Sequence, residues 1–545
     1  MNFSTIDYVI FAVYIIGIVS LGLFVSRDKK GHQKDSNDYF LAGNKLTWWA
    51  IGASLIAANI SAEQIIGMAG SGFAVGLAIA SYEWMAAITL IIVGKYFLPI
   101  FIEKKIYTIP EYIEKRYNKN LKTILAIFWI FLFIFVNLTT VIFLGAKALD
   151  TIMGAGDGTM IIPFIIILAA IAAAYSLYGG LSAVAWTDVI QVILLVLGGL
   201  IATIIALDHV TPDGGVFAGL SHLYNTAGDK FHMILEKGNP EFDNLPGIAV
   251  LIGGMWIANL YYWGFNQYII QRTLAAKSLK EAQKGIVFAA GLKLIIPLIA
   301  VIPGIIAYVL FMQPEGTVVI DGIRESFAKS GGGINYDKAY PWLISHFIPV
   351  GLKGVVVAAL TAAIVSSLAS MLNSTSTIFT MDIYKPYIRK DKSEKRLVRV
   401  GRISAAVALV IACFIAPLLK SVPQAFQYIQ EYTGLVSPGI LAVAMLGLFW
   451  KKTTTKGAIW GAILSIPVAL FLKLSIVQLP FLDQMLYTFL ISIVIIAMVS
   501  LTTSEVDDDS QGITLTSKMF KTDSTFNIGA YLIVIILAFL YTIFW

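Results

Sequence analysis

Cysteine, histidine and charge are all scarce in this chain of 545 residues. The single cysteine, Cys413, excludes a disulfide framework and a thiolate metal site within the sequence. The five histidines show no spacing typical of metal ligands, so we expect no histidine metal site. Only 13% of the residues are charged, whereas 58% are hydrophobic. This balance excludes an ordinary soluble domain and predicts an all-α protein that crosses the membrane many times.

Long apolar segments recur along the whole chain. A transmembrane helix needs about 20 predominantly apolar residues. The sequence predicts about fourteen transmembrane helices, at 7–25, 46–72, 79–102, 122–147, 160–178, 184–206, 247–271, 285–311, 350–382, 401–419, 424–449, 457–473, 482–502 and 526–544.

Lysine and arginine are unevenly distributed between alternate loops. One set of loops is basic, with residues such as Lys104, Lys105 and Arg116, whereas the opposite set holds far fewer. Cytoplasmic loops carry the excess of basic residues in membrane proteins. We therefore expect the basic loops in the cytoplasm and both termini outside. The two longest loops, 207–246 and 312–349, are then also outside.

The second apolar segment has a polar centre. Asn59, Ser61, Glu63 and Gln64 lie within six residues of one another, near the middle of the membrane. Polar side chains are costly in lipid, so such a cluster predicts a functional site that faces protein or water. The alternative is that Asn59 and Ser61 only form hydrogen bonds with a neighbouring helix.

The segment 247–271 has a similar centre in the opposite orientation. Its Ala258-Asn259 pair corresponds to Ala58-Asn59, and Gly264 offers a place for the helix to loosen. This segment begins outside, whereas 46–72 begins inside. Interrupted helices at corresponding positions of two inverted halves indicate the binding site of a secondary transporter.

The expected organisation has five parts. They are an extra transmembrane helix and loop at 1–45, a first inverted repeat at 46–206, an outer loop at 207–246, a second repeat at 247–449 and three further helices at 450–545.

Three hydrogen-bonding side chains share one face of the segment 350–382. Ser366, Ser370 and Asn373 are four and three residues apart, and Ser367 lies beside them. This pattern is typical of a close helix–helix contact between small residues. It equally predicts a sodium site, in which serine hydroxyls and carbonyl groups freed at 57–60 supply neutral oxygens.

Ionisable residues also occur deep in the predicted helices. Glu83 and Lys293 are expected to pair with each other, to contact one polar solute, or to do both, and Asp188 lies nearer the cytoplasmic side. Gln430 adds an amide to those of Asn59, Gln64 and Asn259. Amides, one carboxylate and aromatic rings such as Tyr262 and Trp263 suit a neutral polyhydroxylated solute.

Two stretches resemble a known family. Tyr178–Gln191 (YGGLSAVAWTDVIQ) is similar to the signature of the sodium/solute symporter family, and Gln271–Lys277 (QRTLAAK) resembles its sodium/glucose branch. The resemblance covers almost the whole chain. It implies a leucine-transporter-like core of five plus five helices in inverted repeats. It also implies sodium-driven uptake of a hexose, galactose or glucose, by alternating access across a bacterial inner membrane.

The resemblance also implies roles for individual residues. The sodium site would use carbonyl groups of Ala57, Ile60 and Ala363 and hydroxyl groups of Ser366 and Ser367. The sugar site would consist of Gln64, Glu83, Asn259, Lys293 and Gln430, with Asn59 close by. Tyr262 would be the inner gate, with Met68, Tyr82 and Phe426 as the outer gate and Asp188 on the sodium exit route. Ala86 departs from the serine found in a close family member, so one sugar contact is in doubt.

Other functions share part of this pattern. A symporter of myo-inositol or another polyol has the same features, and a sugar sensor or channel of the same fold would not concentrate its solute. A proton-coupled carrier needs a titrating group at the ion site, which serines do not provide. A membrane enzyme is not expected, because paired catalytic carboxylates and nucleophile motifs are lacking. Expected partners are sodium, a small sugar and the lipid bilayer, with neither a nucleic acid nor an obligate protein partner.

Overall fold

The computed structural model describes residues 3–545, apart from 26, 28–34, 107, 155, 212–213, 314–322, 329–332, 389–392, 422–424, 475–478 and 504–511. Every regular element in this described part is a helix, and only two isolated β-bridges occur in it. A helix satisfies its backbone hydrogen bonds internally, which a bilayer requires of any segment that crosses it. The all-α membrane architecture predicted from composition is thus confirmed.

The first half of the chain forms a continuous series of helices. They are α1 (Thr5–Val25), α2 (Ser36–Leu41), η1 (Ala42–Asn44), α3 (Trp48–Asn59), η2 (Glu63–Gly67), α4 (Met68–Ala74), η3 (Leu77–Ala80), α5 (Ser81–Ile92), η4 (Val93–Phe97), α6 (Leu98–Glu103), α7 (Ile109–Arg116), α8 (Lys119–Phe131), η5 (Leu132–Leu138), α9 (Thr139–Met153), α10 (Ile161–Asp208), α11 (Val216–Thr226) and η6 (Gly228–Phe231).

The second half continues in the same way. Its helices are α12 (Ala249–Ile252), α13 (Gly254–Phe265), α14 (Gln267–Leu274), α15 (Leu279–Ala300), α16 (Ile302–Met312), α17 (Ile323–Phe327), η7 (Tyr336–Lys338), α18 (Ala339–Phe347), α19 (Leu352–Ile378), η8 (Phe379–Ile388), α20 (Glu394–Ile415), η9 (Ala416–Ser421), α21 (Ala425–Phe449), α22 (Thr455–Leu474), α23 (Phe481–Thr502) and α25 (Ser524–Ile543).

The described residues contain eleven helices that are long and apolar enough to cross a membrane. The bent pair formed by α3 and Glu63–Ala74 adds a twelfth. Two further predicted segments appear in shorter helical pieces. The segment 160–178 is the first part of α10, before its break at Gly180 (φ 63°, ψ −155°), and its apolar stretch is Ile161–Ala174. The segment 247–271 is divided among α12, α13 and α14. The number of fourteen crossings therefore stays a prediction.

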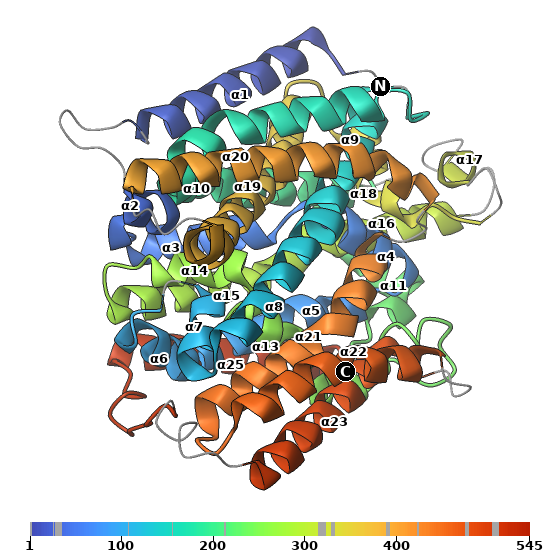
Figure 1. Cartoon of the computed structure of the whole chain (residues 1–545). Helices are drawn as coiled ribbons and strands as arrows, with labels where there is room; N and C mark the ends of the chain where they lie inside the picture. Colours follow the sequence, from blue (N-terminus) through green and yellow to red (C-terminus); the bar gives the residue numbers. More distant parts are fainter. Residues whose placement is uncertain are drawn as a thin grey trace.

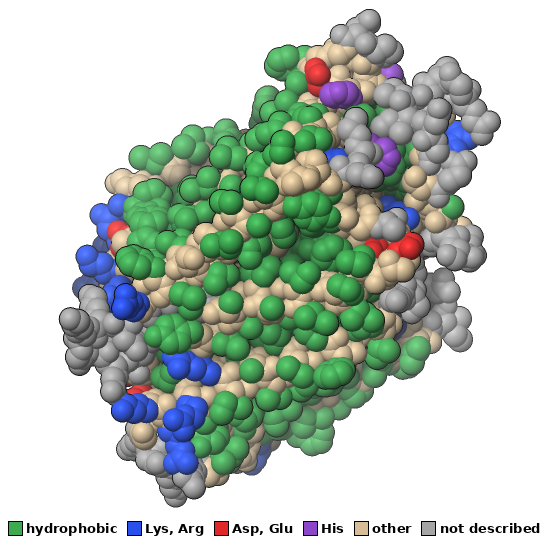
Figure 2. Space-filling view, turned by 90° about the horizontal axis from the view of Figure 1, so that it is seen from above, with side chains coloured by type: hydrophobic (Ala, Val, Ile, Leu, Met, Phe, Trp, Pro, Cys, Tyr) green, Lys and Arg blue, Asp and Glu red, His purple; other side chains and the backbone are tan. Residues whose placement is uncertain are grey.

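The outer surface has the distribution of charge expected for a membrane protein. Figure 2 shows a wide band of hydrophobic side chains, with most Lys and Arg at one end and Asp, Glu and His at the other. Large apolar side chains on this surface include Phe24 on α1 and Phe539 on α25, exposed by 75% and 63%. Such exposure is favourable only against lipid, so these helices form the periphery of the bundle.

Helix α19 lies in the interior of the bundle. All of its side chains from Val356 to Ile378 are buried, and it packs against α10, α9, α20 and α3. Figure 1 shows it behind α20, with α1 at one side of the molecule and α22 and α23 at the opposite side. A helix that is buried all round has no face turned to water, so the serines and Asn373 of α19 must face other parts of the protein.

Two helices are interrupted near their middle. Helix α3 ends at Asn59, Ile60 is extended (φ −78°, ψ 98°), and the chain resumes at Glu63 at an angle of 59°. The second interruption lies at Asn266 (φ −84°, ψ 120°), between α13 and α14. The helix thus breaks two residues beyond Gly264, the position at which the sequence predicts that it loosens. Gly264 is helical, and it allows close packing because a Cβ atom there would stand 2.7 Å from the ring of Phe97.

Candidate functional site

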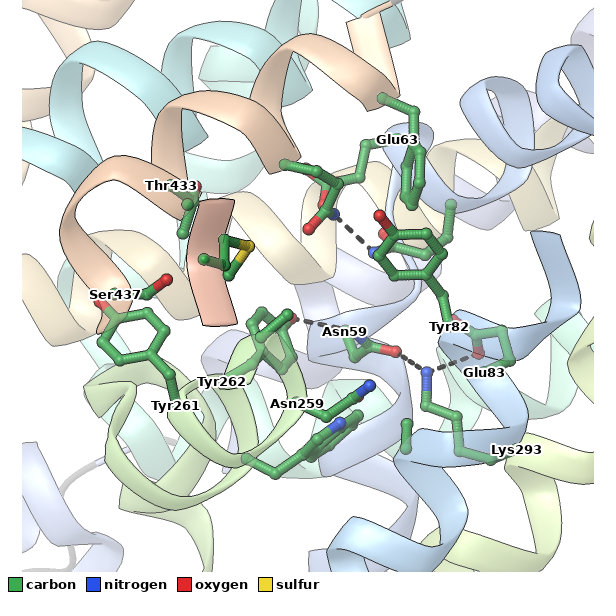
Figure 3. Close-up of a pocket in the computed structure, with 18 residues that line it drawn as sticks. Asn59, Glu63, Tyr82, Glu83, Asn259, Tyr261, Tyr262, Lys293, Thr433 and Ser437 are labelled. Carbon is green, nitrogen blue, oxygen red and sulfur yellow. Dashed lines mark hydrogen bonds and ion pairs between the residues drawn. The ribbon is translucent and has the colours of Figure 1, made fainter. Parts of the chain in front are cut away.

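A narrow cavity of about 60 Å³ lies where the broken ends of α3 and η2 meet α5, α13, α15 and α21 (Figure 3). Its walls are formed by Asn59, Glu63, Gln64, Tyr82, Glu83, Ala86, Ala258, Asn259, Tyr261, Tyr262, Trp263, Lys293, Phe426, Gln430, Thr433, Gly434, Ser437 and Met485. These residues come from both halves of the chain. The fold therefore brings together side chains that are up to several hundred residues apart in the sequence.

The predicted sugar residues all line this cavity. They are Gln64, Glu83, Asn259, Lys293, Gln430 and Asn59. Three predicted gate residues, Tyr262, Tyr82 and Phe426, are also in its wall, and the rings of Tyr82 and Phe426 meet edge to face at 5.2 Å. Met68 is buried in α4 and is not a lining residue. The structure thus brings these residues together, and their roles stay predictions.

A chain of hydrogen bonds crosses one side of the cavity. The ammonium group of Lys293 lies 2.5 Å from Glu83 Oε2 and also donates to Asn59 Oδ1. Asn59 Nδ2 donates to the hydroxyl of Tyr262 at 2.9 Å. Of the two interpretations for Glu83 and Lys293, the structure shows the direct pair. A buried ion pair needs such additional hydrogen bonds to offset its loss of hydration.

The amide of Gln64 is held by its neighbours in the chain. Its Oε1 atom accepts hydrogen bonds from Ser61 N and Oγ at 3.3 and 3.0 Å, and its Nε2 atom donates to Glu63 Oε1 at 3.1 Å. The residues between the two halves of the broken helix therefore orient each other. This local network joins three of the four polar residues of the segment, and the fourth, Asn59, bonds Tyr262 and Lys293 instead.

Three polar atoms in the wall have no hydrogen-bond partner among the described residues. They are Glu63 Oε2, Tyr82 Oη and Ser437 Oγ. A buried polar group without a partner is costly, so these atoms indicate a place for a polar ligand or water. The sequence prediction did not assign Ser437 or Thr433. Thr433 and Ser437 lie three and seven residues after Gln430, so all three side chains share one helix face. This spacing could have identified both residues from the sequence.

The predicted sodium residues meet at the broken end of α3. Ser367 Oγ donates to Ala58 O at 2.9 Å and lies 3.5 Å from Ala57 O. Ala57, Ile60 and Ala363 are buried as well. The last carbonyl groups of a helix lack intrahelical partners, so α3 offers free oxygens at this point. Ala58 lies in the stretch 57–60 that was expected to supply carbonyl oxygens, although the resemblance to the family named only Ala57 and Ile60 there.

A buried ionic cluster lies next to these residues. Asp188 Oδ1 accepts a hydrogen bond from Ser366 Oγ at 2.5 Å, and its Oδ2 accepts one from Ser54 Oγ. The guanidinium group of Arg272 lies 3.6 Å from Asp188. It also donates to the carbonyl of Ser54 at 3.0 Å and to Ser370 Oγ.

Asp188 and Arg272 thus join four helices, α3, α10, α14 and α19. Both residues are fully buried. The sequence analysis placed Asp188 on the sodium exit route. It named Arg272 only as part of the stretch Gln271–Lys277 that resembles the sodium/glucose branch. No local pattern links positions that lie 84 residues apart.

A bundle with two interrupted helices around a buried polar cavity is the architecture of a secondary transporter. The model of the sodium:solute symporter family matches residues 39–465, and the chain belongs to this family. It is 65% identical to the sodium/glucose cotransporter of Vibrio parahaemolyticus, over 99% of this chain and 98% of that protein. It is 34% identical to human sodium/myo-inositol cotransporter 2, over 84% of this chain and 68% of that protein.

A solved structure shares the fold. The substrate-bound, outward-open structure of a Na⁺-coupled sialic acid symporter matches with a TM-score of 0.78 at 24% identity, over 92% of this chain and 99% of that one. The leucine-transporter-like fold implied by the resemblance is confirmed.

Proposed function

We propose that this protein imports a hexose, galactose or glucose, together with sodium ions, by alternating access. The observation that carries the proposal is the mid-bundle cavity, where all six predicted sugar residues converge and three buried polar atoms have no partner in the part of the chain that the structure describes. The 65% identity with a sodium/glucose cotransporter over nearly the full length of both chains supports the hexose as solute.

The chemistry of the cavity suits a neutral sugar. Glu83, Asn259 and Gln430 supply groups that exchange hydrogen bonds with hydroxyls, and Lys293 supplies a donor. The ring of Tyr262 would cover the apolar face of the sugar as the inner gate. Tyr82, Phe426 and Met68 would close the outer side.

The ion would bind where α19 meets α3. Serine hydroxyl and backbone carbonyl oxygens are ligands that a hard cation of low charge accepts, and Ser367 already contacts the carbonyls of α3. Sodium at Ala57, Ile60, Ala363, Ser366 and Ser367 would tie α19 to α3 and favour the outward-open state. Each ligand must bind one state better than the other in order to shift the equilibrium.

The proposal extends to the division of the chain into repeats and to its orientation in the membrane. Residues 46–206 and 247–449 would be the two inverted repeats, with 1–45 and 450–545 outside them. The basic end of the molecule in Figure 2 would face the cytoplasm of a bacterium, with both termini on the outer side of the inner membrane. Sodium would leave past Asp188 when α19 moves away from α3.

A second candidate is sodium-coupled symport of myo-inositol or another polyol. The identity of 34% with a human sodium/myo-inositol cotransporter favours it. Inositol presents the same hydroxyl groups on a ring of similar size, so the residues above serve either solute.

Uptake into proteoliposomes tests the proposal. An inward sodium gradient should accumulate galactose or glucose above equilibrium, whereas a choline gradient should not. Accumulation of myo-inositol alone would favour the second candidate. Sodium-independent equilibration of every solute would contradict symport and favour a sensor or channel.

A further inference from the structure

A second groove, of about 280 Å³, lies where α3, α15 and α25 meet. Its walls are formed by Trp48, Lys284, Val287, Phe288, Thr525 and Phe526, none of which lines the mid-bundle cavity. The rings of Trp48 and Phe288 meet edge to face at 5.6 Å, and the two residues are 40% and 36% exposed. Tight packing closes the floor of the groove, because a Cβ atom at Gly529 would lie 2.3 Å from Val287.

The groove continues into the apolar outer surface of the bundle. Beyond Thr525, the same face of α25 carries Ile528, Leu532 and Ile535, which are 60%, 55% and 64% exposed. On α15, Gly291 borders open space, because a Cβ atom there would meet no other atom within 4 Å. The face from 525 to 535 is about 15 Å long at about 1.5 Å per residue, which is roughly half of a hydrocarbon core of about 30 Å. The apolar track therefore spans one leaflet of a bilayer.

The mouth of the groove has one lysine more than it has carboxylates to pair with. Lys280 and Lys284 are four residues apart on one face of α15, where like charges repel. Lys280 lies 3.2 Å from Asp523. Glu281 is engaged by the start of α3, since its Oε2 atom accepts a hydrogen bond from Trp48 N at 2.7 Å. Lys284 has no ion-pair partner in the described part of the chain, so an anion beside it would be stabilised.

We propose that this groove binds an anionic phospholipid from the leaflet at the basic end of the molecule. The lipid phosphate accepts a hydrogen bond from Lys284 Nζ, and an acyl chain lies along Phe288 and the exposed face of α25. A basic pocket between transmembrane helices suits an anionic head group, and tryptophan is typical of this depth in a membrane. A choline or ethanolamine group would instead add a cation beside two lysines. The site does not depend on which solute the protein transports.

Native mass spectrometry of the full-length protein tests the head group. The protein in detergent is titrated with phosphatidylglycerol or with phosphatidylcholine of the same acyl chains. We expect wild type to bind the first phosphatidylglycerol at least about fivefold more tightly, which is the contribution of one lysine near an anionic lipid. Lys284→Gln should lose this preference and keep its affinity for phosphatidylcholine, whereas Lys284→Arg should retain the preference. Lys395→Gln is the matched control, because Lys395 is an exposed lysine in the first turn of α20 and does not line the groove.

A second pair of variants tests the apolar track. Gly291→Leu places a side chain in the open space beside the groove and should weaken the binding of both lipids to the same degree. Gly17→Leu on α1 is its control, because a Cβ atom at Gly17 also meets no atom within 4 Å. It should leave the affinity for both lipids unchanged.

Equal affinity of the wild type for the two lipids would overturn the proposal. Equal losses in Lys284→Gln and Lys395→Gln would overturn it as well, because they would indicate a diffuse attraction to the basic end. Inorganic phosphate should not displace phosphatidylglycerol, and displacement would show that the site takes a free anion and not a lipid. If Lys284→Gln does not fold, the two lipids on the wild type and the comparison of Gly291→Leu with Gly17→Leu decide the matter.

Discussion

At the scale of single residues, the clearest prediction concerns the serine hydroxyls of α19. Ser367 contacts carbonyl groups at the end of α3, where sodium would bind. We predict that Ser367→Ala loses sodium-driven uptake because the ion loses a ligand that links the two helices. The measurement is initial uptake against sodium concentration. Ser376→Ala on the same helix is the control, since its buried hydroxyl has no partner in the described structure. Uptake by Ser367→Ala equal to that of the wild type at low sodium would remove Ser367 from the ion site.

Ala86 offers a test by gain of function. It lies in the cavity wall on α5, three residues after Glu83, where a serine hydroxyl would add a hydrogen bond to the solute. A net hydrogen bond contributes about 0.5–1.5 kcal/mol, or about 2- to 10-fold in affinity. We expect Ala86→Ser to bind galactose more tightly by a factor in this range, measured by equilibrium binding. Unchanged or weaker binding would show that position 86 does not contact the sugar.

At the scale of helices, Arg272 and Asp188 determine how four of them meet. Removing one member of a buried ion pair leaves a charge without compensation, at a cost of about 3–5 kcal/mol. We predict that Arg272→Met lowers the thermal stability of the purified protein strongly. The double variant Asp188→Asn with Arg272→Met should recover much of the loss, because it leaves no buried charge. Independent, additive losses would show that the two residues are not energetically coupled.

The last helix, α25, begins at a capped end. Asp523 Oδ1 accepts a hydrogen bond from Phe526 N at 2.9 Å, and Lys280 lies 3.2 Å from its Oδ2. The hydrogen bond from the Phe526 amide, together with the charge of Lys280, lowers the pKa of this carboxyl from its usual value of 3.8. The cap therefore contributes stability above pH 3.8, and the contribution is lost as pH falls through the lower pKa of the folded state.

We expect Asp523→Ala to lower the free energy of unfolding by about 1 kcal/mol near neutral pH. Asp523→Asn retains an acceptor for the Phe526 amide and should lose less. Hydrogen exchange of the first amides of α25 is the direct measurement. Equal exchange in all three proteins would show that the cap does not hold this end.

At the scale of the whole molecule, the proposed orientation predicts that the two ends of the bundle face opposite sides of the membrane and differ in their accessibility to a reagent outside the cell. The chain has one cysteine, so Cys413→Ala provides a cysteine-free background. In that background, Lys237→Cys in the outer loop should react with a membrane-impermeant maleimide on intact cells. Lys395→Cys, in the first turn of α20 at the basic end of the molecule, should react only after the membrane is opened. Both positions are exposed in the structure, and the reverse labelling pattern would invert the topology.

Some features were determined by the sequence alone. The low charge content and the recurring apolar segments specify a membrane bundle, because lipid admits only apolar helices with internally bonded backbones. Asn59, Glu63 and Gln64 indicate the site, because a polar side chain in a membrane segment is costly unless it faces protein, water or a ligand. Such signals are local, and a single segment displays them.

Only the tertiary structure decided which groups meet. Lys293 is shared by Glu83 and Asn59, Arg272 pairs with Asp188, and one oxygen of Glu63 has no partner among the described residues, although these six residues stand in or directly beside predicted helices. The second helix breaks at Asn266, two residues beyond Gly264, and Gly264 lies close to Phe97 from the other half of the chain. These outcomes depend on distances between segments that are far apart in sequence, and residue spacing along one helix carries no information about them.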